Sequence, residues 1–349
     1  MKVQINKSSK INSVDFNNLN FGEICTDHMF VCDFTNGDWN EPKILPYESL
    51  KLDPSSSVFH YGQSVFEGMK AYKDDKGQTW LFRPEDNYNR LISSSIRLSI
   101  PKFPKKYFFE GLKKLLQIDS NWIKPGKGNS LYVRPFVFAN TAGLSASPSK
   151  SYKFMIICSP AQSYYTGETN VKIAENYSRA AKGGVGFAKA AGNYAAQFYP
   201  TSLALQEGYQ QIIWTDSHSH KYIEESGTMN IFVEINNTLI TTPTSDTILD
   251  GITRKSIIEL CAYLKKNVEI RRLSIDELIK SSSEGTLKEM FGCGTAVVIN
   301  PIKSFSYKNK KYLLPLLNNS FSSLLKEKIT SIQHNISEDI FNWRYRVDN

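Results

Sequence analysis

The chain has 349 residues, of which 41% are hydrophobic and 22% charged, and a formal net charge of +8. This length exceeds what one ordinary core needs and predicts two domains, and the composition excludes a disordered or fibrous chain. The longest apolar runs, such as FMIIC and TAVVI, are far shorter than the roughly 20 residues that cross a bilayer. With no apolar segment near the N-terminus either, we expect no membrane association, no secretory signal and a cytoplasmic location.

The excess of positive charge does not form a recognisable nucleic-acid surface. Lysines are scattered, and the densest group, KNKK at 308–311, has no aromatic RNA-binding motif beside it. We therefore expect no nucleic-acid partner and interpret the basic surface as suited to anionic metabolites. The five cysteines are odd in number and lack C-x-x-C spacing, which predicts free, mostly buried thiols. His218 and His220 have same-face strand spacing but no third ligand, so no metal site is predicted.

The first half of the chain predicts short strands that alternate with amphipathic helices. Pro84 opens the clearest helix, acidic residues occupy its first turn, and Pro101 ends it. Apolar residues at helical spacing predict a second helix over 107–118. Strands are expected at SLYVRPFVF (130–138) and YKFMIIC (152–158).

The second half is richer in hairpins. Strands are predicted at QQIIW, TMNIFVEI and TLITT, and a helix in GITRKSIIELCAYLKK starts just after Gly251. Together with the first half, this pattern predicts a mixed α/β (α+β) fold. TAGLSASPSK and SPAQSYYTGETN are both candidate linkers, and composition does not choose between them.

The segment GGVGFAKAAGNYAAQ (183–197) places one lysine, Lys189, among glycines and alanines. A P-loop needs Gly before and Ser or Thr after the lysine, but Ala188 and Ala190 stand there. The dinucleotide fingerprint fails because Lys189 occupies the third glycine position. Burial disfavours a charged amine and exposes its nucleophilic lone pair, which permits a Schiff base. A surface lysine in a small-residue loop is the alternative on residue type alone.

Four more segments accompany this one in order: YGQSVFEGMKAY, EESGTMNIFV, LDGITRKS and FGCGTAVV. Together the five resemble the branched-chain amino acid aminotransferases, which are fold-type IV enzymes that use pyridoxal 5'-phosphate. The resemblance extends from about residue 21 to FNWRYRV near the end of the chain. It implies a smaller N-terminal α/β domain (1–165), an interdomain loop (166–180) and a larger barrel-like C-terminal domain (181–349), with the cofactor between the domains.

The resemblance also implies the activity. The amino group would move between L-leucine, L-isoleucine or L-valine and 2-oxoglutarate, through a Schiff base of pyridoxal phosphate on Lys189, whose amine would then carry the proton. Glu225 matches the carboxylate beside the pyridine nitrogen; strand alternation sends its neighbour Glu224 to the opposite face. The other residues implied for the cofactor are Arg90, the backbone N–H groups of Ile252 and Thr253, and Thr295 for the phosphate, and Tyr194 for the phenolic oxygen.

Substrate residues are implied in the same way. Aromatic walls are expected from Phe21, Phe66, Tyr132 and Tyr164, and a floor from Thr228 and Ala296. Tyr61 and Arg134 match positions near the carboxylate-binding end, where they would accept the second carboxylate of glutamate. A homodimer is implied too. Val297 and Asn300 replace the redox C-x-x-C of some animal members, so thiol regulation is not expected there, and Ser145-Ala146 replaces a Gly-Val step.

Three alternatives remain open. A D-amino acid aminotransferase or an aminodeoxychorismate lyase would have the same fold, although SVFEGMKAY and the aromatic pocket favour the branched-chain type. A metabolite-binding protein that kept the scaffold without activity is the third, and the complete set of Lys189, Glu225, Arg90 and Thr295 argues against it. The sequence ranks neither the three substrates nor the biosynthetic and degradative directions.

Overall fold

The computed structural model describes residues 1–162 and 169–348. The chain divides into two compact units: the first comprises Met1–Tyr164, Ala188–Ala191 and Thr330–Asn349, and the second Tyr165–Phe187 and Gly192–Ile329. The predicted domains are contiguous ranges, whereas two later segments of this chain belong to the first unit. The predicted boundaries at 165 and 181 stay a prediction.

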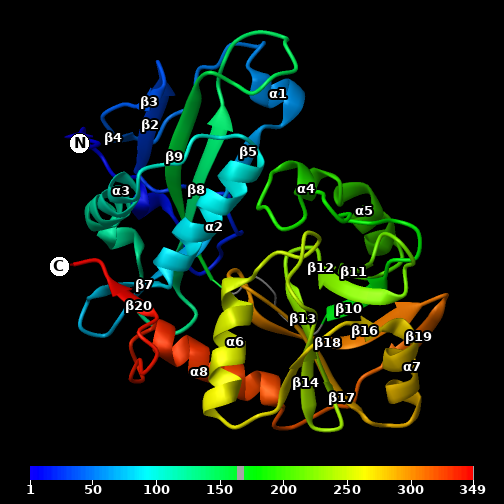
Figure 1. The fold of residues 1–349 in the computed structure, drawn as a ribbon. Coiled ribbons are helices and arrows are strands. Elements are labelled where there is room, and N and C mark those ends of the chain that lie inside the picture. The colour runs from blue at the N-terminus through cyan, green and yellow to red at the C-terminus, as the bar shows by residue number, and fades with distance from the viewer. Residues whose placement is uncertain (163–168, 349) are drawn as a thin grey trace. The chain divides into compact units, whose positions relative to one another are not determined.

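The first unit is built on a ten-stranded sheet in the order β1-β4-β2-β9-β8-β6-β7-β20, with β3 beside β2 and β5 beside β8 (Figure 1). All pairings except that of β1 with β4 are antiparallel. Its strands are β1 (Lys2–Val3), β2 (His28–Thr35), β3 (Asp38–Trp39), β4 (Lys43–Pro46), β5 (Ser64–Phe66), β6 (Met69–Lys73), β7 (Thr79–Phe82), β8 (Ser130–Ala139), β9 (Tyr152–Ala161) and β20 (Arg344–Arg346). Its helices include α1 (Ser57–Tyr61), α2 (Pro84–Arg97) and α3 (Lys105–Ile118).

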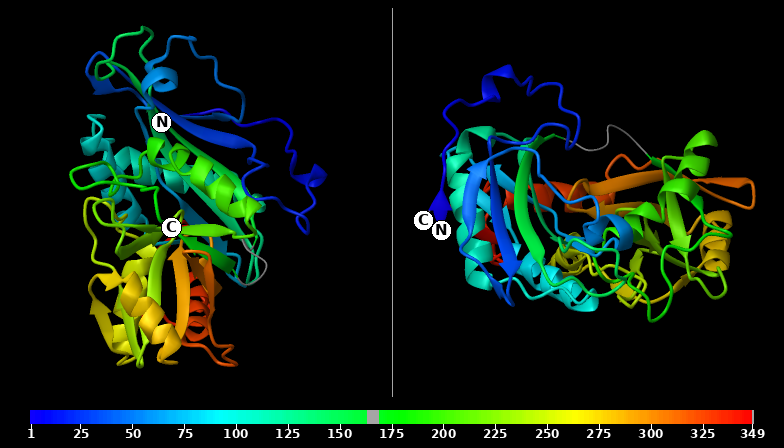
Figure 2. Two further views of the ribbon diagram at one scale, coloured as in Figure 1. Left: turned by 90° about the vertical axis from the view of Figure 1, so that its right-hand side faces the viewer. Right: turned by 90° about the horizontal axis from the view of Figure 1, so that it is seen from above.

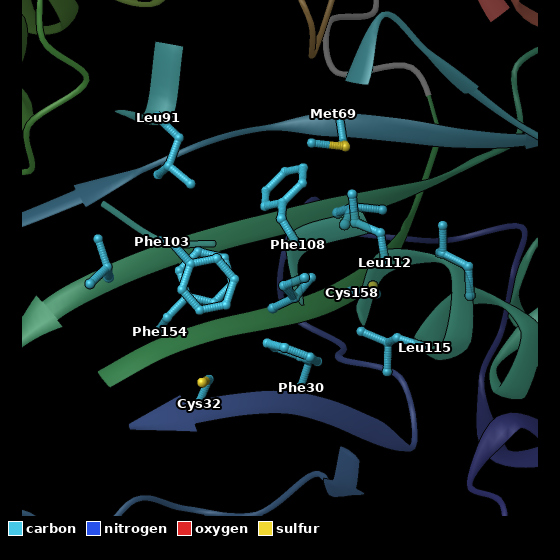
Figure 3. Packing of buried hydrophobic residues seen from close by; sticks show 14 of the residues in the cluster. Phe30, Cys32, Met69, Leu91, Phe103, Phe108, Leu112, Leu115, Phe154 and Cys158 are labelled. Carbon is cyan, nitrogen blue, oxygen red and sulfur yellow. The ribbon is translucent and has the colours of Figure 1, made fainter. Parts of the chain in front are cut away.

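One face of this sheet forms the main core of the first unit. Side chains alternate along β2, so that Phe30 and Cys32 face the core under α2 and α3 while Met29 and Val31 face a smaller cluster. Figure 2 shows the two helices, in cyan and teal, from further directions. Phe103 and Phe154 stack at 3.7 Å between ring centroids at the centre of this core (Figure 3). The core therefore fixes α2 firmly against the sheet.

The second unit contains a sheet that closes on itself. Strands β12, β13, β17, β18, β10 and β11 form a ring because β13 pairs with both β17 and β12. The strands are β10 (Thr169–Ile173), β11 (Gln211–Thr215), β12 (Tyr222–Ser226), β13 (Asn230–Ile235), β14 (Thr238–Thr241), β15 (Val268–Ile270), β16 (Leu273–Ser274), β17 (Leu287–Gly294), β18 (Val298–Tyr307) and β19 (Lys310–Leu313). The helices are α4 (Gly192–Ala195), α5 (Phe198–Gln206), α6 (Ile252–Tyr263) and α7 (Ile275–Ser283), and α8 (Phe321–Gln333) runs across the division between the units.

The predicted helices at 84 and 107 and after Gly251 are present, as are the predicted strands of both halves. Five residues of the predicted interdomain loop, Thr169–Ile173, instead form β10 and pair with β11 and β18. Apolar and polar residues alternate in this segment, as is typical of a strand, and Val171 and Ile173 are fully buried while Lys172 is not. The cysteines are free and four of the five are buried, as predicted. No helix of the described residues has the length and apolar character needed to cross a membrane.

Candidate active site

Lys189 lies in a short extended segment, 188–191, that runs antiparallel to β5 of the first unit. Val65 bridges to Ala190, the Phe66 N–H donates to the Lys189 carbonyl at 3.1 Å, and the Ser94 hydroxyl of α2 accepts the Lys189 N–H at 2.9 Å. Ala188 and Ala190 are buried in the core of this unit. Because side chains alternate along an extended segment, burying both alanines directs Lys189 away from that core.

The amine of Lys189 lies close to Phe66, from which a chain of contacts leads to three more of the predicted substrate residues. Its Nζ lies 4.8 Å from the centre of the Phe66 ring, and the Arg134 guanidinium covers the same ring at 4.6 Å. Arg134 Nη2 donates to the Tyr132 hydroxyl at 3.0 Å, and the Phe21 ring meets Tyr132 edge-on at 4.8 Å. Phe66, Arg134, Tyr132 and Phe21 therefore form one aromatic cluster with a cation, and Phe66 is its member beside the lysine amine.

Glycine is needed at position 68 for this arrangement. A Cβ there would lie only 2.0 Å from the Tyr132 hydroxyl oxygen, well inside any real contact. Tyr132 is otherwise buried between neighbouring strands, so its hydroxyl has little room to retreat. The glycine of the VFEGMK motif thus lets the tyrosine hydroxyl approach the backbone of the turn that follows β5.

Arg90 projects from α2 and makes a two-point ion pair with Glu67. Its Nε and Nη2 donate to the two carboxylate oxygens at 2.7 and 2.9 Å, and Glu67 is fully buried. Asn87 adds a further donor to Glu67 at 2.7 Å. Two parallel bonds orient a guanidinium plane firmly. Arg90 is therefore held in one direction, and Glu67, which the sequence interpretation missed, does the holding.

In the second unit, Glu225 is buried on β12 with partners on each carboxylate oxygen. Oε1 lies 2.9 Å from Arg179 Nη2, and Oε2 accepts from Asn230 Nδ2 and the Leu249 N–H, each at 3.1 Å. Arg179 is also held by the carbonyls of Gly186 and Thr247. Glu225 is thus buried among hydrogen-bond donors and beside one cation.

Helix α6 begins beside this carboxylate. Gly251 caps it, and Asn230, which donates to Glu225, also donates to the Leu249 carbonyl at 2.9 Å. A Cβ on Gly251 would lie 1.9 Å from Asn230 Oδ1, so glycine is required for this approach. Ile252 and Thr253 form the first turn and are buried. Backbone N–H groups in a first helical turn have no acceptor within the helix, and they attract anions.

Two turns of the second unit bring Thr228, Thr295 and Ala296 near each other. A Cβ on Gly294 would lie 2.9 Å from the Thr228 carbonyl oxygen, which shows how closely the turns after β12 and β17 approach. Thr228 is exposed, whereas Thr295 and Ala296 are half-buried. Tyr194 is half-buried in α4, where the side chain of its neighbour Asn193 donates to the Val185 carbonyl at 2.8 Å.

The two remaining predicted substrate residues are Tyr61 and Tyr164. Tyr61 ends α1, is 45% exposed, and donates its hydroxyl to the Leu144 carbonyl at 2.5 Å. Tyr164 lies outside the described residues.

Three residues that support the site were not found from the sequence: Glu67, Ser94 and Arg179. Each acts through a neighbour distant in the chain, which no local pattern reveals. The only indication in the sequence was the position of Arg179, which lies close before the glycine-rich segment.

Comparison with known proteins identifies the chain. The family model of class IV amino-transferases matches residues 64–305. A probable branched-chain-amino-acid aminotransferase of Staphylococcus aureus (strain N315) is 45% identical over 338 residues, covering 94% of this chain and 93% of the relative. The branched-chain-amino-acid transaminase 1 of Bacillus subtilis (strain 168) is 44% identical over 340 residues, covering 95% of each. A crystal structure of the Escherichia coli branched-chain amino acid aminotransferase superposes with a TM-score of 0.76 at 25% identity, covering 92% of this chain and 99% of that one.

The chain therefore belongs to the class IV aminotransferase family, and it is a transferase. Within that family, the resemblance to the branched-chain amino acid aminotransferases of fold type IV is confirmed. The predicted mixed α/β fold with a closed, barrel-like second sheet is confirmed as well.

Proposed function

We propose that the protein transfers the amino group between L-leucine, L-isoleucine or L-valine and 2-oxoglutarate, with pyridoxal 5'-phosphate as cofactor and Lys189 as the catalytic residue. The single observation that carries the proposal is the position of the Lys189 amine, 4.8 Å above the Phe66 ring. A backbone held between β5 and Ser94 keeps it there. The family and the nearly full-length relatives support the same activity.

The residues present fit pyridoxal phosphate by the chemistry of their donors. A phosphate dianion needs cations and N–H groups, which Arg90, the first turn of α6 at Ile252 and Thr253, and the Thr295 hydroxyl would supply. Gly251 lets Asn230 approach the start of α6, and Asn230 also donates to Glu225. The first turn of α6 and the Glu225 carboxylate are therefore joined through Asn230, which supports their binding one cofactor. When bound, the cofactor supplies an aldehyde that accepts an amine and an electron-withdrawing ring.

Each residue then has a defined task. The Lys189 amine would hold the cofactor and would move the proton from the substrate α-carbon. The Glu225 carboxylate would hold a proton on the ring nitrogen of the bound cofactor, and Arg179 places a positive charge beside that carboxylate. Tyr194 would donate its hydroxyl to the phenolic oxygen of the ring.

The substrate residues combine apolar walls with a cation. Phe21, Phe66, Tyr132, Thr228 and Ala296 are the residues proposed to bind a branched aliphatic side chain. Arg134, together with Tyr61, would bind the second carboxylate when glutamate or 2-oxoglutarate is present. The stacking of Arg134 on Phe66 supports this, because the guanidinium adds a charge to a surface that is otherwise aromatic.

The decisive experiment measures amino transfer from L-leucine to 2-oxoglutarate by the purified holoprotein. We expect Lys189→Ala to lower the rate by about a thousandfold or more. Lys172→Ala, which changes a lysine paired with Glu207 at the surface, is the matched control and should retain the wild-type rate. Borohydride reduction followed by peptide mapping should leave the cofactor's mass on Lys189.

Other outcomes would favour the alternatives. Turnover of D-leucine with none of L-leucine would indicate the D-amino acid aminotransferase. No turnover by wild-type protein that carries the borohydride adduct would indicate a binding protein.

We also propose a cytoplasmic homodimer. Phe59, Tyr61 and Leu144 are 61%, 45% and 69% exposed, and large apolar side chains gathered at one surface commonly mark a protein interface. Tyr61 and Leu144 are joined by a hydrogen bond, so they belong to one patch. Light scattering coupled to gel filtration should give twice the mass of 39.6 kDa, and Phe59→Glu should give the monomer.

A further inference from the structure

One cavity lies in the second unit. It encloses about 560 Å³, a size that suits a small metabolite. Its walls come from the hairpin before β12, the start of β12, the loop after β14 and Arg272. None of the residues proposed above for catalysis, cofactor or substrate contributes to its lining.

Glu224 provides an unsatisfied acceptor in this cavity. Its side chain lies on β12 next to Glu225 and is only 9% exposed. Oε1 accepts from the Thr247 hydroxyl at 2.6 Å, whereas Oε2 is buried and has no hydrogen-bond partner among the described residues. Burial raises the pKa of this carboxyl, and Asp216 adds to the effect, against the Thr247 bond and the charges of Arg179 and Arg272. A buried carboxylate oxygen without a donor is costly, so a ligand that brings an ammonium group would relieve it.

The lining also includes a cation, Arg272. The Arg272 guanidinium lies 3.7 Å from the centre of the Tyr222 ring and is 54% exposed. Its nearest carboxylate, Asp216, is 3.8 Å away. Asp216 is already bonded by its own hairpin, from the N–H and hydroxyl of Ser219 and the N–H groups of Lys221 and Tyr222. Arg272 therefore has donors directed at solvent that can bind an anion.

The cavity thus offers three different surfaces to one ligand. Glu224 accepts a proton donor, Arg272 and the exposed Lys182 attract a carboxylate, and Ile223, Pro243 and Ile248 provide apolar contact. We propose that this cavity binds a free α-amino acid, whose ammonium group donates to Glu224 Oε2 and whose carboxylate pairs with Arg272. A ligand with only one charge would leave one of these walls unpaired.

The site is connected to the catalytic carboxylate through Thr247. Its hydroxyl donates to Glu224, and its backbone carbonyl accepts from Arg179, which pairs with Glu225. Gly186 allows the approach, since a Cβ there would lie 2.7 Å from the Asp246 carbonyl and 2.8 Å from Thr247 Cα. An amino acid bound at Glu224 is therefore in a position to act as an effector of the enzyme.

Cycloleucine (1-aminocyclopentane-1-carboxylate) is a suitable probe because it has no α-hydrogen and cannot be transaminated. We would titrate it calorimetrically into full-length holoprotein and determine the crystal structure of the complex. Cycloleucine is expected in the cavity, and Glu224→Gln and Arg272→Ala should each weaken that binding about tenfold or more, or ~1.4 kcal/mol. Glu284→Gln, an exposed glutamate at the end of α7, is the control and should bind as the wild type does.

Two analogues test the need for both charges. Cyclopentylamine lacks the carboxylate and cyclopentanecarboxylate lacks the amine, and each should bind the cavity about tenfold more weakly than cycloleucine. The proposal is overturned if the crystals show no cycloleucine at Glu224, if the two variants bind it as wild type, or if either analogue binds as tightly. Because the crystal structure locates the bound cycloleucine, binding in this cavity is distinguished from binding at Lys189 and does not depend on whether the protein transaminates leucine.

Discussion

Two buried arginine–glutamate pairs, one in each unit, have the same composition and different construction. Glu67 is fully enclosed and receives two bonds from Arg90, one from Asn87 and one from the Gly68 N–H. Glu225 meets Arg179 through a single nitrogen at 2.9 Å, and Arg179 Nε has no hydrogen-bond partner among the described residues.

The two ion pairs therefore have different effects on their members. The first pair is closed, because two nitrogens of Arg90 bond the two oxygens of Glu67, and its effect is to fix Arg90. The second pair is open, because Arg179 supplies charge without enclosing the carboxylate. We interpret Glu67 as a positioning residue and Glu225 as the residue that touches the cofactor.

Breaking the closed pair should have the largest effect on stability. Glu67→Gln leaves the Arg90 charge buried without a carboxylate, and removing one member of a buried pair costs about 3–5 kcal/mol. We expect the free energy of unfolding to fall by about that amount in denaturant titration. Excess pyridoxal phosphate should restore much of the activity, since only the orientation of Arg90 is disturbed. A loss of activity that excess cofactor does not change would show that Glu67 does more than position Arg90.

Breaking the open pair should act on catalysis more than on assembly of the site. Glu225→Gln removes the negative charge and should lower kcat for L-leucine by about 10²–10³, or about 3–4 kcal/mol of transition-state stabilisation. Excess pyridoxal phosphate should not restore the rate, in contrast to Glu67→Gln. A variant with wild-type kcat would refute the assignment of Glu225.

A third buried pair consists of two glutamates, Glu289 and Glu234, with no arginine. Glu289 faces Glu234 across β17 and β13; Lys266 bonds Glu234, and the Ser322 N–H and hydroxyl bond Glu289. Burial raises the pKa of Glu289 above 4.5, and Glu234 adds to this against the Ser322 bonds. The protonated form is therefore favoured by folding, so this contribution to stability is present at low pH and lost as pH rises through the raised pKa.

Glu289→Gln should remove that dependence. We expect the free energy of unfolding of the variant to fall less than that of the wild type between pH 4.5 and neutral pH. Denaturant titrations at several pH values measure it, with Glu284→Gln at the surface as the control. Parallel curves for Glu289→Gln and the wild type would contradict the raised pKa.

The smallest effect is expected for an exposed pair of the same type. Arg271 makes two bonds to Glu277, at 2.6 and 3.0 Å, with both side chains more than one third exposed. Water solvates the separated charges well, so Arg271→Gln should cost about 1 kcal/mol or less. A cost as large as that of Glu67→Gln would show that geometry, rather than burial, sets the strength of these pairs.

Local patterns in the sequence were sufficient for much of the fold. The Pro84 start, the Gly251 cap and the short apolar run of β13 all report short-range physics, namely backbone restriction and strand propensity, and the structure confirms each element. The five family motifs indicated the site residues as well, because they follow one another along the chain in the expected order. Strand β10 was missed because the resemblance assigned those residues to a loop.

What the sequence by itself determined was the class of enzyme, the fold and the lysine on which the chemistry is proposed to depend. Tertiary structure alone decided which groups hold the proposed catalytic residues: Glu67 on Arg90, Arg179 on Glu225, Ser94 on the Lys189 backbone, and the cavity at Glu224. These partners are separated by 23 residues or more, and such contacts form only when the chain has folded, because they depend on which strands and turns are brought together and on burial from water.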